Sequence, residues 1–105
     1  MMRNKNIEPS QVKTLIESGP TTIYDMRDIN SFNNDHMKNA VPANDFAIEQ
    51  LMKNNKKMEN ILVYCYSGNS SRDLSSLLTK LGFKNVYNLV GGYTAWKKFN
   101  QAEII

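Results

Sequence analysis

The residue best suited to covalent chemistry is Cys65, the single cysteine of the chain, which follows a short apolar run at residues 61–64. A continuously apolar run of this length predicts a strand that is covered on both faces in a parallel sheet. Open parallel sheets bind ligands beyond the carboxyl ends of their strands, and Cys65 stands at such an end. The position therefore favours a functional role, although a free cysteine is often only a small buried hydrophobe.

The segment after Cys65 is rich in small and turn-forming residues: Tyr66, Ser67, Gly68, Asn69, Ser70 and Ser71. A loop of this kind that enters a helix can point several backbone N–H groups into one cavity, where they and the helix dipole favour an anion. The natural anion is the Cys65 thiolate, since such surroundings lower a cysteine pKa from about 8.5 to roughly 3.5–7.5. We expect Cys65 to be the nucleophile and the six loop residues to bind substrate through their N–H groups.

The spacing between Cys65 and Arg72 bears on which anion the loop accepts. Phosphatases that use a cysteine resemble a pattern in which an arginine, sixth after the cysteine, grips the phosphoryl oxygens with its planar fork. Here Ser71 is sixth and Arg72 is seventh. One residue rotates a helical side chain by about 100°, so Arg72 should point away from the loop centre. The spacing disfavours a small phosphatase or arsenate reductase.

The elements that must position this loop follow from hydrophobic periodicity and turn residues. Helices are predicted near residues 12–16, 45–52, 71–81 and 94–99, strands at 21–26, 61–64 and 85–89, and mostly loop at 27–44 with a helical turn near 29–32. Strands that alternate with helices predict an α/β fold with a mainly parallel central sheet flanked by helices on both faces. We expect a single domain over residues 1–105.

Two of the predicted helices have specific end signals and apolar faces. Asp45 is expected to cap the helix at 45–52, with Phe46 among its apolar contacts. The helix at 71–81 is expected to bury a stripe of leucines and to end at Gly82 as a C-cap. The stripe comprises Leu74, Leu77, Leu78 and Leu81.

Composition excludes several classes of protein. With 105 residues, 41% hydrophobic and 22% charged, the chain can form one core without disulfides, and its one Cys and one His cannot build a four-ligand zinc site. We expect no metal and no other cofactor.

The net charge of +3 comes from scattered lysines, so we expect no nucleic-acid partner. The longest apolar runs are far too short for a membrane span, and a free cysteine without a secretory leader suggests the cytoplasm.

Further motifs surround the cysteine loop. They are Tyr24-Asp25-Met26-Arg27, Phe32, His36, Leu81-Gly82-Phe83, Val86-Tyr87-Asn88-Leu89 and Gly91-Gly92-Tyr93-Thr94-Ala95-Trp96. Together, over about residues 7–99, these motifs and the loop resemble the rhodanese family, and most of all its single-domain bacterial thiosulfate sulfurtransferases of the GlpE type. One departure is Met37-Lys38-Asn39, which stands where many members have a hydrophobe, Pro and Gly, so this turn should differ in shape.

The resemblance implies sulfur transfer in two steps. The Cys65 thiolate would take the outer sulfur of thiosulfate, release sulfite and hold the sulfur as a persulfide within the loop. Cyanide, or a cellular thiol such as a thioredoxin-like protein, would then remove it. An alternative is a sulfur carrier or interaction module that receives persulfide sulfur from a partner protein.

The remaining motif residues favour structural roles. Asp25 and Arg27 follow a strand and are expected to bond each other or nearby backbone, and His36 is expected to form a structural hydrogen bond. Gly91 and Gly92 are expected to permit a tight turn before the last helix. They suggest phosphate binding only weakly, because no dinucleotide-binding glycine pattern surrounds them. Trp96 is expected in the core, while Tyr66 and Ser67 either line the pocket mouth or face solvent.

Overall fold

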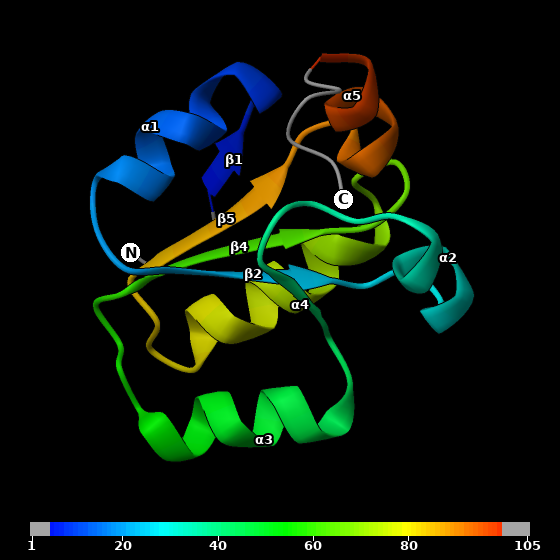
Figure 1. The fold of residues 1–105 in the computed structure, drawn as a ribbon. Helices are drawn as coiled ribbons and strands as arrows, with labels where there is room; N and C mark the ends of the chain where they lie inside the picture. Colours follow the sequence, from blue (N-terminus) through cyan, green and yellow to red (C-terminus); the bar gives the residue numbers. More distant parts are fainter. Residues whose placement is uncertain (1–4, 100–105) are drawn as a thin grey trace.

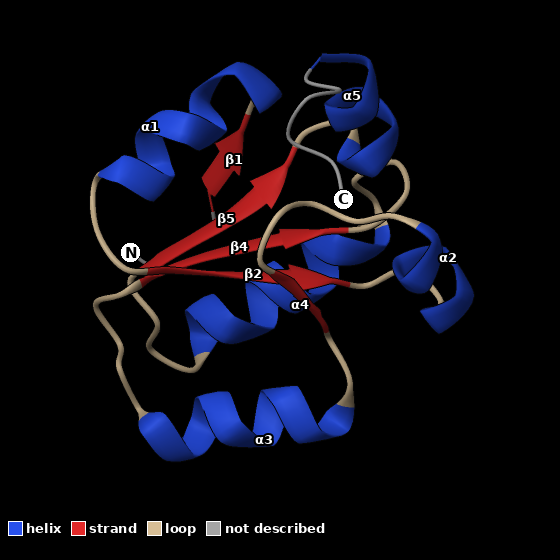
Figure 2. Ribbon diagram, viewed as in Figure 1, coloured by secondary structure: helices blue, strands red, loops and turns tan. Residues whose placement is uncertain are grey.

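The computed structural model describes residues 5–99 and has the α/β architecture that the sequence predicts (Figures 1 and 2). Within these residues five strands form one all-parallel sheet in the order β1-β5-β4-β2-β3. The strands are β1 (Lys5–Ile7), β2 (Thr21–Asp25), β3 (Ala40–Pro42), β4 (Asn60–Tyr64) and β5 (Asn85–Leu89). The predicted domain limits, residues 1 and 105, lie outside the described residues.

Within the described residues four α-helices connect successive strands and a fifth follows β5: α1 (Val12–Glu17), α2 (Ile29–Asn34), α3 (Asp45–Asn54), α4 (Ser70–Lys80) and α5 (Gly92–Phe99). Helices α1 and α5 lie on one face of the sheet, and α3 and α4 lie on the other (Figure 1). Helix α2 lies near the end of β2 rather than over either face (Figure 1). Between residues 5 and 99 no helix has the length and apolar character needed to cross a bilayer.

The central strand β4 divides its side chains between two cores, as a strand covered on both faces must. Leu62 and Tyr64 belong to the core that includes Trp96 of α5, and Ile61 and Val63 belong to the core beneath α3 and α4. These four side chains of β4 are nearly inaccessible to water. Burying an aliphatic side chain contributes about 1.5–3 kcal/mol. The predicted mainly parallel sheet with helices on both faces is confirmed.

Helix α4 buries a different face from the predicted leucine stripe. Leu78 is fully buried, but Leu77 and Leu81 are about half exposed, at 50% and 46%. The side chains that face the interior are mostly hydroxyls: Ser71, Ser75 and Thr79, with Leu74 packed beside them. The hydroxyls of Ser75 and Thr79 each donate to a carbonyl one turn back, both at 2.9 Å. A hydroxyl that donates a hydrogen bond to its own helix can be buried. The spacing of the leucines does not reveal such buried hydroxyls.

The ends of three helices also differ from the predicted ones. Asn44, not Asp45, caps α3, because its Oδ1 accepts the Ala47 N–H at 2.8 Å. Phe46, predicted as an apolar contact of that helix, is 68% exposed. Gly82 follows the C-cap Leu81 rather than being the cap, and α5 begins two residues earlier than expected.

The strands β1 and β3 were not predicted from the sequence. Each has three residues, lies at an edge of the sheet and buries one side chain, Ile7 in β1 and Ala40 in β3. So short a strand shows no alternating pattern, and only its pairing with a neighbour defines it. The predicted helical turn near residues 29–32 is the start of α2, which begins after Asp28, whose carboxylate accepts the Ser31 N–H.

Candidate functional site

Cys65 follows β4 at the carboxyl end of the sheet, with β2 and β5 on either side. Its side chain is buried, with 4% of the residue exposed. Three hydrogen-bonding groups surround Sγ: the Gly68 N–H at 3.2 Å, the Ser71 N–H at 3.3 Å and the Ser71 hydroxyl at 3.3 Å. The loop therefore curls around the sulfur atom and turns backbone donors towards it.

These contacts decide the acidity of Cys65. Burial acts to raise the pKa of the thiol, but hydrogen bonds from the Ser71 hydroxyl and from the N–H groups of Ser71, Gly68 and Ser67 lower it further than burial raises it. The net effect is a pKa below the ordinary value. Because these donors are uncharged dipoles, the site favours a compact anionic sulfur without supplying a cationic clamp.

The predicted loop residues divide by what they contact. Gly68 and Ser71 bond Sγ, and the Ser67 N–H also favours the thiolate. Asn69 stands at the N-cap of α4, where its carbonyl accepts the Arg72 N–H, and Ser70 is the first residue of that helix. The Tyr66 carbonyl accepts the Thr94 N–H at 3.1 Å.

The Gly91-Gly92 turn places the start of α5 in contact with the cysteine loop. The Tyr93 N–H donates to the Cys65 carbonyl at 2.8 Å, beside the bond from Thr94 to Tyr66. Gly92 has a φ of +60°, and a Cβ there would lie 2.5 Å from the carbonyl oxygens of both Cys65 and Tyr66. The glycine thus permits the close approach that fixes these two carbonyls, a role beyond that of the predicted tight turn.

Gly68 also needs to be glycine, and it lies beside the Gly91-Gly92 turn. Its φ is +99°, and a Cβ there would lie 3.2 Å from the Gly91 nitrogen and from the Leu89 carbonyl oxygen. Only glycine adopts this backbone conformation without strain. The Gly68 N–H faces the sulfur because the backbone turns here.

We expect Gly68→Val to reduce sulfur transfer at least about tenfold, since a β-branched side chain at positive φ must displace the loop backbone. Gly82→Val is the matched control, because Gly82 has a φ of +101° and open space, with only the Lys57 side chain near 4 Å. Both variants share the cost of a positive φ, about 1–2 kcal/mol of unfolding free energy, and only Gly68→Val also meets backbone atoms. Activity assays and urea denaturation of both variants test the prediction. Full activity in Gly68→Val would contradict the expected role of the loop backbone.

A buried ion pair lies beside the loop at the end of β2. The Asp25 carboxylate accepts from the Arg27 N–H at 2.7 Å and from Arg27 Nη2 at 2.8 Å, and both side chains are at least 96% buried. The Tyr64 hydroxyl donates to the same carboxylate at 2.6 Å and accepts the Met37 N–H at 3.2 Å. Burial and the neighbouring Asp25 carboxylate raise the pKa of Tyr64 well above its usual range. The pair connects β2, β4 and the turn at Met37.

Tyr64→Phe should lower the free energy of unfolding by about 1–2 kcal/mol, because the variant removes one hydrogen bond to the buried Asp25 carboxylate and the hydroxyl that accepts the Met37 N–H. Tyr87→Phe on the neighbouring strand is the control, since Tyr87 is only partly buried, and it should change stability by less than about 0.5 kcal/mol. Chemical denaturation measures the free energy of unfolding of both variants. Equal values would show that the hydrogen bonds of the Tyr64 hydroxyl do not stabilise the fold.

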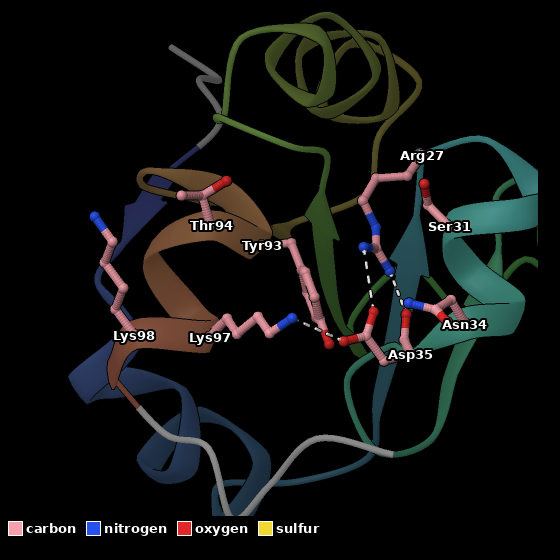
Figure 3. A pocket seen from close by; sticks show the side chains of 8 residues that line it. All are labelled: Arg27, Ser31, Asn34, Asp35, Tyr93, Thr94, Lys97 and Lys98. Atoms are coloured by element: carbon pink, nitrogen blue, oxygen red, sulfur yellow. Dashed lines mark hydrogen bonds and ion pairs between the residues drawn. The ribbon is translucent and has the colours of Figure 1, made fainter.

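Arg27 also forms one wall of a pocket of about 420 Å³ between α2 and α5 (Figure 3). Its guanidinium lies 3.9 Å above the Tyr93 ring and donates to the Asp35 carbonyl at 2.6 Å. The Asp35 carboxylate lies 3.3 Å from Lys97 Nζ, and Figure 3 shows both side chains at the pocket wall. Burial and the Asp35 charge raise the pKa of Tyr93 to about 12, so its phenol is neutral at physiological pH.

A contact that the sequence did not reveal joins the cysteine loop to α2. The Tyr66 side chain is half exposed, and its hydroxyl contacts the Ser31 hydroxyl at 2.6 Å and donates to the Asp28 carboxylate. Hydrogen bonds from Tyr66 and Ser31 lower the pKa of Asp28 to about 2. Tyr66 therefore spans from the loop to the cap of α2, and no local pattern in the sequence indicates that pairing.

The other predicted motif residues lie away from Sγ. His36 Nδ1 lies 2.7 Å from the Phe32 carbonyl oxygen, and the two rings are stacked at 4.0 Å. Trp96 is a core residue, 4% exposed. In the divergent turn Met37 is buried, while Asn39 takes the left-handed conformation with a φ of 68°.

Arg72 is exposed on α4 and takes no part in the contacts to the sulfur described above. With Ser67, Gly68 and Asn88 it lines a pocket of about 120 Å³ beside the cysteine loop, and Cys65 itself does not line this pocket. That Arg72 points away from the loop centre stays a prediction.

Comparison with known proteins assigns the chain to a family. Residues 8–99 match the model of the rhodanese-like domain. The chain belongs to the rhodanese-like domain family. It is 33% identical over 96 residues to a thiosulfate sulfurtransferase GlpE from Coxiella burnetii, covering 91% of this chain and 90% of the relative. The predicted resemblance, including its GlpE type, is confirmed.

Solved rhodanese-like structures share the fold. A rhodanese-like domain from Anabaena sp. superposes with a TM-score of 0.77 at 25% identity, over 93% of this chain and 76% of that one. A rhodanese-like domain protein from Staphylococcus aureus gives a TM-score of 0.72 at 27% identity, over 88% and 90% of the two chains. The Cys65 loop, the Asp25–Arg27 pair and the glycine turn therefore lie within a rhodanese-like domain.

Proposed function

We propose that this rhodanese-like protein is a thiosulfate sulfurtransferase that carries sulfane sulfur on Cys65. The observation that carries the proposal is the buried Cys65 sulfur, surrounded by N–H groups of its own loop and by the Ser71 hydroxyl. These donors lower the pKa of the thiol and so favour the thiolate, which is the nucleophilic form. Similarity to sulfurtransferases named GlpE over nine-tenths of the chain supports the same activity.

In the first step the Cys65 thiolate attacks the outer sulfur of thiosulfate. An S–S bond forms to Sγ, the S–S bond of thiosulfate breaks, and sulfite leaves with the electron pair. The negative charge then lies on the outer sulfur of the persulfide, where the N–H groups of the loop stabilise it. In the second step an acceptor, either cyanide or a thiolate, attacks that sulfur, and Cys65 leaves as the thiolate.

The acceptor must come from outside, because the chain has no second cysteine to resolve the persulfide. A cellular thiol, such as that of a thioredoxin-like protein, would serve this role. Tyr66 and the pocket between α2 and α5 lie beside the loop and provide the adjoining surface for such an acceptor. No metal, cofactor, membrane or nucleic acid enters this scheme, and a cytoplasmic location suits the free thiol.

Intact-mass spectrometry tests the proposal. Protein incubated with thiosulfate should gain the mass of one sulfur atom, and added cyanide should remove it while thiocyanate appears. Cys65→Ala should gain nothing. A wild-type protein that stays unmodified by thiosulfate, but gains one sulfur from a persulfidated donor protein, would support the sulfur-carrier alternative.

Phosphatase activity should be absent. Ser71 occupies the position at which a phosphatase needs arginine, and Arg72 lies outside the contacts to Sγ, so a tetrahedral phosphoryl group would lack its clamp. We expect hydrolysis of p-nitrophenyl phosphate by the wild type to equal that by Cys65→Ser. Turnover comparable with sulfur transfer, and lost in Cys65→Ser, would overturn this.

A further inference from the structure

The amide of Asn88, near the end of β5, lies behind the cysteine loop and has no part in the two steps above. The residue is 2% exposed. Its Nδ2 donates to the Gly68 carbonyl at 3.1 Å, and its Oδ1 accepts from the Ser71 hydroxyl at 2.5 Å. Asn88 therefore bonds both of the residues that contact the sulfur of Cys65.

The chemistry of these partners fixes the orientation of the amide. The Gly68 carbonyl can only accept, so the NH₂ group of Asn88 must face it and Oδ1 must face Ser71. Oδ1 also can only accept, so the single proton of the Ser71 hydroxyl lies on the Asn88 side. The Ser71 oxygen then turns a lone pair towards the Cys65 sulfur, 3.3 Å away.

This arrangement distinguishes the thiol from the thiolate. In the thiol form, the S–H of Cys65 donates to Ser71, which donates to Asn88, and every group is satisfied. In the thiolate form, the Ser71 hydroxyl must rotate to donate to the sulfur, and Asn88 Oδ1 loses its donor. A buried acceptor without a donor is unfavourable.

We propose that Asn88 is a positioning residue that restrains ionisation of Cys65 by competing with its thiolate for the hydroxyl proton of Ser71. The inference rests on the proposed function, in which Cys65 is the nucleophile. Once sulfur is loaded, the charge moves to the outer sulfur, and the Ser71 proton can return to Asn88. Asn88 thereby favours the persulfide over the empty thiolate.

Charged groups on the surrounding elements do not enter this network. They are Asp25 at the end of β2 and Arg27 just after it, which pair with each other, Asp28 at the cap of α2, and the exposed Arg72 and Asp73 on α4. Tyr93 on α5 is neutral below its pKa of about 12. All of these remain in the variants described next. A change in the acidity of Cys65 among those variants therefore reports on Asn88 and Ser71.

The test is the pH dependence of Cys65 alkylation by iodoacetamide in Asn88→Leu and Asn88→Ala. Both variants release the Ser71 hydroxyl, so the pKa of Cys65 should fall by about one unit, a roughly tenfold larger thiolate fraction at low pH. Ser71→Ala should raise the pKa. Adding Asn88→Leu to Ser71→Ala should change nothing further, since the two residues act in series.

Asn85→Leu is the matched control, because Asn85 lies on the same strand and its Nδ2 also donates to a carbonyl, that of Met58 at 2.7 Å. It should leave the pKa of Cys65 unchanged. The proposal is overturned if both Asn88 variants keep or raise the pKa, or if the shift persists in the Ser71→Ala background. If circular dichroism shows Asn88→Leu unfolded, Asn88→Ala decides alone.

Alkylation needs no sulfur donor, which separates this test from that of the proposed function. A protein that fails to load sulfur from thiosulfate can still show the Asn88 shift. Conversely, normal loading with no shift removes the role of Asn88 and leaves the sulfurtransferase proposal intact.

Discussion

Replacing Cys65 by serine or alanine should lower sulfur transfer from thiosulfate to cyanide at least about a hundredfold. A serine hydroxyl is far too weak an acid to become the attacking anion at neutral pH, and neither variant can form a persulfide. Serine still offers an oxygen to the N–H groups of Gly68 and Ser71, so the loop should keep its shape. Thiocyanate formation measures the activity.

Two controls accompany this experiment. Wild-type protein alkylated with iodoacetamide should lose the same activity, because Cys65 is the single cysteine of the chain. Chemical denaturation should show the serine variant within about 1 kcal/mol of the wild type. If a folded Cys65→Ala protein keeps more than about one-hundredth of the wild-type activity, covalent catalysis at this residue is excluded.

Gly92→Ala should be among the most destabilising single-methyl changes in the protein. The added Cβ would lie 2.5 Å from two carbonyl oxygens, those of Cys65 and Tyr66, in a backbone conformation with a φ of +60°. Left-handed backbone and an overpacked contact together cost about 3 kcal/mol. The melting temperature should therefore fall by more than about 10 °C.

Gly19→Ala is the control, because a methyl group added at Gly19 would have no atom within 4 Å and the residue has no positive φ. Its stability should stay within about 0.5 kcal/mol of wild type. Calorimetry of both variants makes the comparison. If Gly92→Ala and Gly19→Ala have the same melting temperature, the contact between α5 and the cysteine loop does not need glycine.

The parts of the fold that were predicted from sequence are those with strong local signals. The apolar run before Cys65 and the β-branched run at residues 21–26 both became strands, because continuous burial leaves a continuous hydrophobic pattern. The edge strands β1 and β3 bury one residue each and leave no such pattern. The inner face of α4 was mistaken because Ser75 and Thr79 satisfy their hydroxyls within the helix.

The candidate site divides in the same way. The position of Cys65 and the small residues after it follow from the order of strand, loop and helix along the chain. The contacts of Tyr66 with Asp28, of Tyr64 with Asp25 and of Asn88 with Gly68 join segments that are 20 or more residues apart. Tertiary packing alone brings these side chains together, so no local motif could indicate them.

The pairing of β1 with β5 couples the reactivity of Cys65 to completion of the domain. Lys5 at the start of the described chain lies opposite Tyr87, and the strand that leads to Cys65 pairs on one side with β5. Parallel pairings over such separations form slowly, because the intervening chain must close first. Completion of the sheet therefore precedes the full set of contacts at the cysteine loop, since Asn88 of β5 and Tyr93 after the glycine turn both bond that loop.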